Sequence, residues 1–528
     1  MPVYKNLRPG GAQNLIVLLA LLMMVLPAAV LAAGPAAVYE PPSDGPENLK
    51  AVLKEFEEYA EAARRDWNAP GMAVAVVTDQ GLVYARGFGV KRIGGSEPVG
   101  PRTIFQIGSA TKAFTAALTA IMVDEGRLRW EDRVSDYLPE FRLYDAWLTR
   151  QFTLADLMAQ RSGLPPYAGD LQALLGFDRE HILRSLRFIK PVADFRTEFA
   201  YQNSLFLAAA AILEKTTGKS WEDTLQKRLL LPLDLHHTST GLRALQKAED
   251  AAYLHRRIKN KVEVLPPPWP YHDWIYTLGP AGGINSNILD MAVWLGLHLR
   301  QGNFEGRKII SRESLAYMHS PLTRLKEFQR GEENHYGQAW MHTRGAHYTM
   351  VWHTGETSGA GSVAAMAPQA KIGLVVLVNL SGTGLPEALA RRFFDLYFMK
   401  PEVDWSRQLL AETKESEKGK VRPKPPPRPT PPLGLDNYLG TYQNDVYGRI
   451  RVEDRDGSLL LVMGPRRVEL GLRHHDRDAF TLSWPGIADE AGLVFFEGND
   501  SGRAQSITLE VFNPDGAGVF ERVFEEQP

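Results

Sequence analysis

The chain has 528 residues, enough for two or more domains and a large hydrophobic core. Its 60 lysine and arginine residues and 62 aspartate and glutamate residues leave a formal charge of -2, so the charge gives no reason to expect a nucleic-acid partner. There is no cysteine, which excludes disulfides and lipidation through sulfur. The stability of the folded chain must therefore come from its packed core.

The first 33 residues have the layout of a secretory signal peptide. Lys5 and Arg8 precede an apolar run from Leu15 to Leu26, and small residues follow up to Ala33. This order predicts export to the periplasm or the medium, with cleavage at the end of residues 1–33. The alternative is an uncleaved anchor in the inner membrane, because the apolar run through Ala33 approaches the roughly 20 residues that span a bilayer.

Residues 47–402 begin and end with strand-like patterns and have a helical middle. Met72 to Val77 and Leu82 to Phe88 are predicted to form a hairpin. Helical patterns and loops fill most of the span from Ser109 to about Arg300. After it we expect strands at 347–352, 361–368 and 371–380 and a helix at 385–398. This order predicts one α/β (α+β) domain, in which distant segments form a sheet and helices cover it.

The region 403–433 is predicted to be a charged and proline-rich linker. It contains "ETKESEKGK" followed by "VRPKPPPRPTPP", which has seven prolines in twelve residues and favours an extended, semi-rigid spacer. Residues 434–528 then show short alternating runs such as "GRIRVED" and "QSITLEVF", bounded by turn residues. These runs predict a small antiparallel β-domain, either a barrel or a sandwich.

The stretch "IFQIGSATKAFTAAL" places Ser109 and Lys112 three residues apart at the start of a predicted helix. A serine hydroxyl is a weak nucleophile near neutral pH and needs a base within hydrogen-bond reach. Lys112 can be that base only if burial and neighbouring positive charge lower its pKa. Taken alone, such a pair is more often a helix cap and a solvated lysine.

Two later clusters make the pair more specific. Tyr201-Gln202-Asn203 precedes a helical run, and His353-Thr354-Gly355 ends a strand-like run. Singly, each fits an ordinary turn or a histidine at the rim of a sheet. In this order, and separated by about 90 and 150 residues, the three motifs resemble those of the serine β-lactamase and penicillin-binding protein superfamily. The most similar branch is that of the class C β-lactamase-related serine hydrolases, which include D-aminopeptidases, D-alanyl carboxypeptidases and esterases.

The resemblance runs from about residue 50 to 400 and implies a central antiparallel sheet flanked by helices, with an additional helical region. The tail that starts at "YLGTYQNDVYGRIRV" resembles the lipocalin-like domain that often follows such hydrolases. No cofactor and no metal are implied. The expected partner is a small molecule or a short peptide, cell-wall fragments included, and the oligomeric state stays open.

The same resemblance assigns roles to individual residues. The implied catalytic set consists of Ser109 as nucleophile, Lys112 as base, Tyr201 as proton relay and His353. The implied substrate-binding and oxyanion set consists of Asn203, Thr354, Gly355 and Glu356. The oxyanion would be held by the backbone N–H groups of Ser109, at a helix N-terminus, and of Glu356.

One departure from the family pattern affects the expected substrate. Many β-lactamases carry a lysine where this chain has His353, and that cation holds a substrate carboxylate. A histidine is only partly protonated at neutral pH, so we expect carboxylate binding to be weaker and pH-dependent. The histidine points towards aminopeptidase-like or esterase-like members.

The predicted function is an exported serine hydrolase that acts through an acyl-enzyme on small amide or ester substrates, as a peptidase or an esterase. Two alternatives stay open. One is a β-lactamase proper, and the other is a penicillin-binding sensor or cell-wall recognition protein that does not turn its ligand over.

The N-terminal pattern predicts that an exporting bacterium cuts the precursor near Ala33, because a charged start, an apolar core and small residues follow in that order. Mass spectrometry of the periplasmic or secreted protein reads its N-terminus directly. Exported material that still begins at Met1 would contradict cleavage and favour the anchor.

Overall fold

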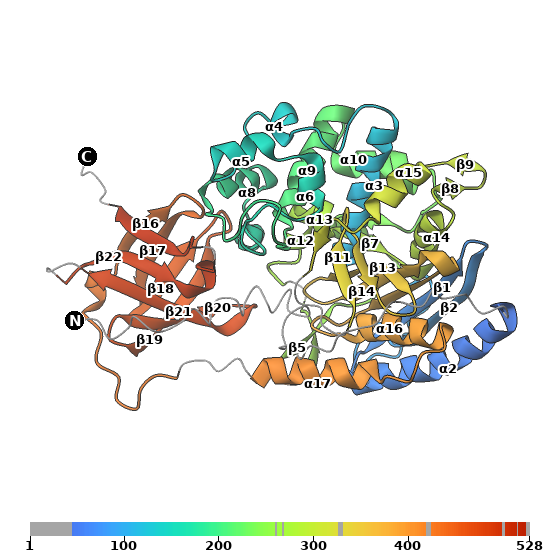
Figure 1. Cartoon of the computed structure of the whole chain (residues 1–528). Coiled ribbons are helices and arrows are strands. Elements are labelled where there is room, and N and C mark those ends of the chain that lie inside the picture. Colours follow the sequence, from blue (N-terminus) through green and yellow to red (C-terminus); the bar gives the residue numbers. More distant parts are fainter. Residues whose placement is uncertain are drawn as a thin grey trace.

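The structure, a computed structural model, describes residues 45–258, 261–266, 269–325, 331–418, 424–498, 502–514 and 516–523 (Figure 1). The expected signal peptide of residues 1–33 lies outside this part of the chain. Within the described ranges, no helix combines the length and the apolar character needed to cross a membrane.

An eight-stranded antiparallel sheet forms the centre of the first domain, as the motif pattern implied (Figure 1). Its strand order places the N-terminal hairpin beside strands that lie about 300 residues later in the chain, with Met72 opposite Val378. In sheet order the strands are β10 (Thr323–Arg324), β11 (Glu333–Tyr336), β12 (Met341–Arg344), β13 (Thr349–Glu356), β14 (Gly361–Ala367), β15 (Ile372–Val378), β1 (Gly71–Thr78) and β2 (Gly81–Gly89).

Both faces of the sheet are covered, so its central strands are apolar throughout rather than alternating. Along β1, Met72, Val74 and Val76 contribute to one hydrophobic cluster, whereas the intervening alanines and Val77 contribute to another. Three helices cover the first face: α2 (Gly45–Asp66), α16 (Leu385–Tyr397) and α17 (Trp405–Lys418).

The opposite face of the sheet carries α14 (Ile288–Leu299) and, beyond it, a larger helical region (Figure 1). The helices of this region are α3 (Thr111–Asp124), α4 (Val134–Tyr137), α5 (Ala146–Gln151), α6 (Leu154–Met158), α7 (Asp170–Leu175), α8 (Arg179–Ser185), α9 (Ser204–Thr217), α10 (Trp221–Leu225), α12 (Trp274–Thr277), α13 (Gly279–Gly282) and α15 (Arg312–Met318). Smaller elements are α11 (Leu242–Lys247) and the short strands β3 (Phe105–Gln106), β4 (Ser239–Thr240), β5 (His255–Ile258), β6 (Lys261–Val264), β7 (Ile284–Ser286), β8 (Asn303–Phe304) and β9 (Arg307–Lys308).

Helix α3 runs through the middle of the first domain and is buried almost all round. Every residue from Thr111 to Met122 is buried, and Phe114 stacks on Trp294 of α14 with ring centroids 4.0 Å apart. Its polar side chains bond inside the core: the Thr115 hydroxyl donates to the Pro280 carbonyl at 2.7 Å. A short 3-10 turn, Gly108–Ala110, leads into this helix and carries Ser109. The nucleophile candidate is therefore attached to a rigid, central element.

The structure differs from the expected linker at its start. Residues 405–418 form α17, and this helix packs on the first domain instead of extending into solvent. Trp405 and Leu409 are buried against the sheet-covering helices, and the Trp405 indole donates to Asp395 at 2.6 Å. The charged run from Glu412 to Lys418 belongs to a helix whose apolar side supplies the packing energy. The prediction of a linker relied on the charged and proline-rich composition and overlooked the two apolar residues Trp405 and Leu409.

The C-terminal domain is a closed barrel, which decides between the barrel and the sandwich expected from the sequence. Its first strand pairs with its last, so no strand edge is left open. The strands are β16 (Gly440–Asn444), β17 (Gly448–Arg455), β18 (Ser458–Met463), β19 (Val468–Asp476), β20 (Ala479–Trp484), β21 (Ala488–Gly498), β22 (Ala504–Leu509) and β23 (Val519–Val523).

The barrel packs against the first domain through a polar contact and an aromatic contact. The backbone N–H of Arg466 donates to the Leu175 carbonyl at 3.1 Å, and its guanidinium donates to Asp273 at 2.7 Å. Trp484 donates to the Tyr271 hydroxyl at 2.9 Å, and buried apolar residues continue across the boundary. The elements touched are the C-terminal end of α7 and the segment that enters α12.

The packing of α17 predicts that Trp405→Ala lowers the free energy of unfolding by about 3 to 5 kcal/mol, because it removes a large buried side chain. The matched control is Gln408→Ala on the exposed side of the same helix, where about 0.5 kcal/mol or less is expected. Chemical denaturation of the full chain measures both. Equal, small effects would mean that residues 405–418 behave as a linker after all.

Candidate active site

Two backbone segments approach each other closely beside Ser109. Gly108 has a φ of +51°, and a Cβ atom built on it would lie 2.5 Å from the backbone nitrogen of Glu356 in β13. A Cβ atom on Gly355 would overlap the Ile107 carbonyl oxygen. Only glycine fits at both positions. This contact brings the serine turn against the end of β13 and explains the glycine of the third motif.

Lys112 is fully buried and hydrogen-bonded on all sides. Its ammonium nitrogen lies 3.2 Å from the Ser109 hydroxyl oxygen and 3.1 Å from the Ala281 carbonyl oxygen, and it also donates to the Asn203 side-chain oxygen. The rings of Tyr201 and Phe206 lie 4.6 and 5.3 Å from it. The lysine is thus in the dry environment that the sequence analysis required of a base.

Burial lowers the pKa of Lys112 from its usual value near 10.5, because the ammonium loses its hydration. The charged neighbour that acts on Lys112 is the acidic Asp170 and not the positive group expected from the sequence, so it favours the protonated form. Asp170 lies beyond Asn203, whose side-chain N–H donates to it at 2.6 Å. Burial raises the pKa of the Asp170 carboxyl, whereas the hydrogen bond from Asn203 and the charge of Lys112 oppose that rise.

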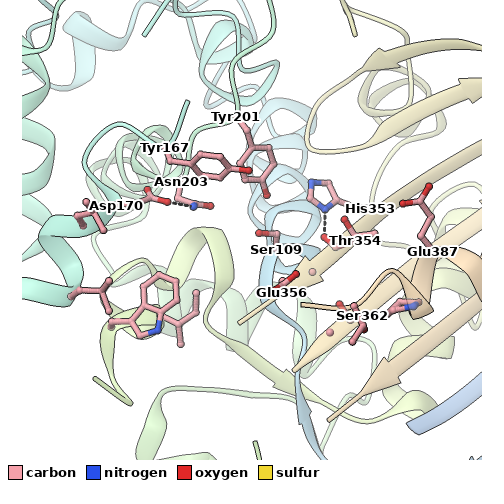
Figure 2. Close-up of a pocket in the computed structure, with 18 residues that line it drawn as sticks. Ser109, Tyr167, Asp170, Tyr201, Asn203, His353, Thr354, Glu356, Ser362 and Glu387 are labelled. Atoms are coloured by element: carbon pink, nitrogen blue, oxygen red, sulfur yellow. Dashed lines mark hydrogen bonds between the residues drawn. The ribbon is translucent and has the colours of Figure 1, made fainter. Parts of the chain in front are cut away.

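Tyr201 lies on the other side of Ser109 and is also buried (Figure 2). Its backbone carbonyl accepts from the Tyr167 N–H at 2.7 Å, which fixes the turn that leads into α9. Burial raises the pKa of the Tyr201 hydroxyl well above its usual value, and the neighbouring Ser109 hydroxyl opposes that rise. The phenol is therefore neutral, so its hydroxyl can donate one hydrogen bond and accept another.

His353 differs from the expectation of a partly charged imidazole. Its Nδ1–H donates to the Thr354 carbonyl, so Nε2 carries no proton and accepts from the Tyr336 hydroxyl at 2.8 Å. Burial and the nearby charge of Lys112 lower the pKa of His353 to about 3. The ring is neutral at physiological pH, and the expected pH-dependent cation is absent because its site is dry.

A hydrogen-bonded chain joins the second motif to the third. The Gln202 N–H donates to the side-chain oxygen of Gln160, whose amide donates to the Tyr336 hydroxyl at 3.0 Å. Tyr336 then donates to His353. Sequence reasoning missed Gln160 and Tyr336, although Gln160 belongs to the "LMAQRSGLPPY" segment that was already part of the resemblance.

The expected motif residues surround one cleft. Figure 2 shows Ser109 at its centre, with Asn203 and Asp170 towards one end and Glu387 towards the other. Thr354 and Glu356 line it from β13. The Glu356 carboxyl accepts from the Gly382 N–H at 2.9 Å, and enclosure raises its pKa to about 8. Apart from Lys112, which lies behind Ser109, each residue expected at the site faces this cleft: Ser109, Tyr201, Asn203, His353, Thr354, Gly355 and Glu356.

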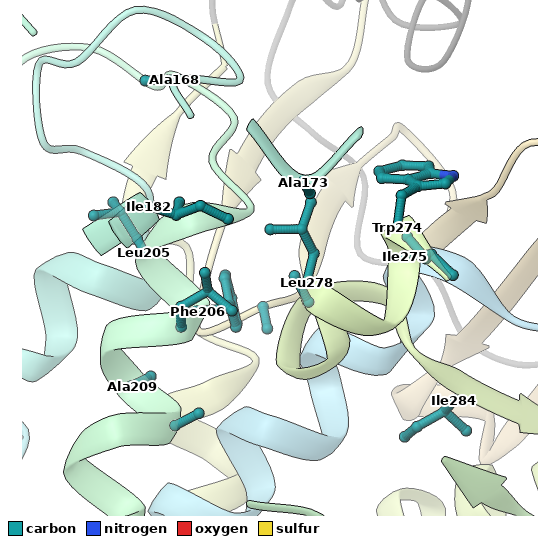
Figure 3. Close-up of a cluster of buried hydrophobic side chains, with 14 of the residues drawn as sticks. Ala168, Ala173, Ile182, Leu205, Phe206, Ala209, Trp274, Ile275, Leu278 and Ile284 are labelled. Carbon is teal, nitrogen blue, oxygen red and sulfur yellow. The ribbon is translucent and has the colours of Figure 1, made fainter. Parts of the chain in front are cut away.

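The wall at the Asp170 end of the cleft is apolar. Leu171 and Leu174 of α7 face Trp274 and Ile275 of α12 there. Figure 3 shows Trp274 and Ile275 near Leu278, with Phe206 and Leu205 of α9 in the neighbouring buried layer. Asp170 and this wall were not singled out from the sequence, because their residue types are ordinary in any helix. Among the described residues, no group of three or more His, Asp or Glu side chains is arranged to hold a metal ion.

Comparison with known proteins agrees with this geometry. The family model described as Beta-lactamase matches residues 56–396, which is more than half of the chain. The protein belongs to the β-lactamase family of serine hydrolases. A second model, described as a domain of unknown function (DUF3471), matches residues 424–522 and so covers the barrel.

Curated relatives include an unguisins hydrolase of Aspergillus campestris, 27% identical over 76% of this chain and 77% of its own length. Penicillin-binding protein 4 of Amycolatopsis lactamdurans is also 27% identical, over 74% of this chain and 97% of its own. Among solved structures, the octameric penicillin-binding protein homologue from Pyrococcus abyssi superposes with a TM-score of 0.60 at 21% identity, and covers 86% of this chain and 97% of its own. This last similarity supports the fold alone.

The neutral state of His353 predicts that His353→Gln lowers kcat/KM by about tenfold or less, through lost hydrogen bonds to Tyr336 and Thr354, and by the same factor at each pH. The acidic limb of the pH profile should keep its position, because an imidazole with a pKa of about 3 does not titrate there. Steady-state kinetics between about pH 5 and 9 check this. An acidic limb that vanishes in the variant would show that His353 is the titrating group.

Proposed function

We propose that this protein is an exported serine hydrolase that acts through an acyl-enzyme on small amide or ester substrates, as a peptidase or an esterase. The observation that carries the proposal is the pair of Ser109 and Lys112, whose oxygen and nitrogen lie 3.2 Å apart in a dehydrated site. A serine becomes a nucleophile when a neutral amine is held at this distance.

The chemistry follows from the arrangement around that pair. Ser109 Oγ bonds to the substrate carbonyl carbon while its proton moves to neutral Lys112. The Tyr201 hydroxyl gives its proton to the leaving nitrogen or oxygen and takes one from Lys112. The bond to the leaving group breaks, and an ester on Ser109 remains. Water then attacks this ester, Lys112 and Tyr201 move its proton to Ser109 Oγ, and the acid is released.

The negative oxygen formed in each attack needs donors that are already in place. Ser109 sits at the N-terminal turn that leads into α3, and the backbone nitrogen of Glu356 lies beside Gly108. Their N–H groups are the pair that we assign to the oxyanion, and the positive end of α3 adds to their effect.

The neutral His353 argues against efficient β-lactam hydrolysis, because β-lactams carry a carboxylate that a fixed cation would hold. Of the residues that line the cleft in the described part of the chain, none is lysine or arginine. Peptide amides and esters without a carboxylate near the scissile bond fit this cleft better. The relatives named unguisins hydrolases support turnover.

A second candidate function is ligand recognition without turnover, since one relative is named a penicillin-binding protein. The two candidates differ in deacylation. Steady release of product from a chromogenic ester supports the hydrolase. One burst of product per protein molecule, followed by no further release, supports the sensor.

The barrel is part of this proposal because of where it binds. Its Arg466 and Trp484 contact the C-terminal end of α7 and the segment before α12. Helices α7 and α12 form the apolar wall of the cleft. We assign to it the role of fixing the width of the cleft, and thereby the size of the substrate.

The proposal predicts that a serine-directed phosphonate labels Ser109 and that Ser109→Ala abolishes labelling. Lys112→Ala should lower kcat by about 100- to 10,000-fold, since general-base help is lost. In the wild type, activity should fall about tenfold per pH unit below the lowered pKa of Lys112, because only the neutral amine accepts the proton. Peptide mapping and pH-dependent kinetics measure these effects.

As a control for folding, the circular dichroism spectrum and melting temperature of each variant should match those of the wild type. Near-normal turnover in Lys112→Ala, with the label on another serine, would contradict the assignment of both residues.

A further inference from the structure

Asp170 has a carboxylate oxygen that the fold leaves without a partner. The residue is the first of α7 and is 9% exposed. One oxygen accepts from Asn203 at 2.6 Å, whereas the other is buried and makes no hydrogen bond to the described residues. An unpaired buried acceptor of this kind is costly, and a charged one more so. Such an oxygen fits a donor that arrives from outside.

The position of Asp170 shows what kind of donor this is. The residue lines the cleft next to Asn203, on the side away from Lys112 and Ser109 (Figure 2). Leu171 and Trp274 are part of the apolar wall at the same end. A ligand at this end of the cleft can therefore direct an N–H donor to Asp170 and an apolar side chain to the wall that contains Leu171 and Trp274.

The charges of the cleft favour a cationic donor. Its lining contains Asp170, Glu356 and Glu387 and, among the described residues, no lysine or arginine, and the His353 ring that also lines it is neutral. Glu387 already accepts from the buried Arg391 at 2.8 Å, and Glu356 accepts from the Gly382 N–H. Of these three carboxyl groups, only Asp170 has an oxygen that is buried and makes no hydrogen bond to the described residues.

We propose that Asp170 binds the primary ammonium group of the substrate's acyl part, so that the cleft selects aminoacyl amides or esters with a free amino group and an apolar side chain. This inference rests on the proposed hydrolase function and names its substrate class. It also assigns Asp170 as a binding residue, which none of the three motifs contains.

The same contact couples substrate binding to the chemistry. Without a bound ammonium, the charge of Asp170 favours the protonated form of Lys112, the form that cannot act as a base. A substrate ammonium on Asp170 offsets that charge and adds a second positive charge near Lys112. The lysine then loses its proton more easily. N-blocked substrates lack this effect.

Substrate pairs that differ only in the amino group test the proposal. We compare leucyl p-nitroanilide, in both D and L forms, with its N-acetyl counterpart. The wild type should show a kcat/KM at least about 100-fold higher for the free amine of the preferred enantiomer, because a site built for a donor rejects an analogue that lacks it. Asp170→Asn should reduce this ratio to about one, mainly by slowing the free amine. Glu180→Gln, the same charge change at an 84% exposed site on α8, should leave the ratio unchanged.

Binding is measured separately from turnover, so that the two proposals fail in different ways. By calorimetry, 3-methylbutylamine should bind the wild type and not Asp170→Asn, and 3-methylbutanol should bind neither. An equal ratio in wild type and Asp170→Asn, or equal binding of amine and alcohol, overturns the role of Asp170. Absence of phosphonate labelling at Ser109 and of p-nitrophenyl acetate hydrolysis, with amine binding retained, overturns the hydrolase function and leaves the binding site standing.

Discussion

The dehydrated ammonium group of Lys112 is the constraint on which the rest of the site depends. Removing a lysine from water costs several kcal/mol unless its donors are satisfied. Three oxygens accept from it, that of Ser109 one turn away and those of Asn203 and Ala281 from distant segments, and two aromatic faces cover it. Helix α3 has to be buried almost all round for this to happen, which explains why it lies in the middle of the domain rather than on its surface.

A second constraint, the close approach of two backbones, places the nucleophile. Gly108 and Gly355 let the serine turn touch the end of β13, and a side chain at either position would separate them. The chain from Gln202 through Gln160 and Tyr336 to His353 then holds the second and third motifs in register. His353 serves as a neutral member of this chain, and its lack of charge also leaves the cleft without a cation for carboxylates.

In this cleft, the charge of the Asp170 carboxyl group and the charge of the Lys112 amine affect each other. The buried carboxyl group of Asp170 faces the buried amine of Lys112 across the Asn203 amide. Burial has the larger effect on the pKa of Lys112, and the charge of Asp170 opposes it. The barrel contributes from outside, because Arg466 fixes the end of the helix that begins with Asp170. Substrate recognition, base strength and domain packing therefore meet at α7.

The sequence alone determined the local elements and the reactive residues. The hairpin of β1 and β2, the helix after Ser109 and the strand that ends in His353 follow from residue patterns, because hydrophobic period and turn chemistry are local properties. The three motifs were equally visible, since nucleophile, base and relay need particular residue types. Only the tertiary structure decided the charge of His353, the pairing of Asp170, the role of Gln160 and Tyr336, and the packing of α17. Each of these depends on which distant groups exclude water from a side chain, and burial is a property of the assembled fold that no short stretch of sequence contains.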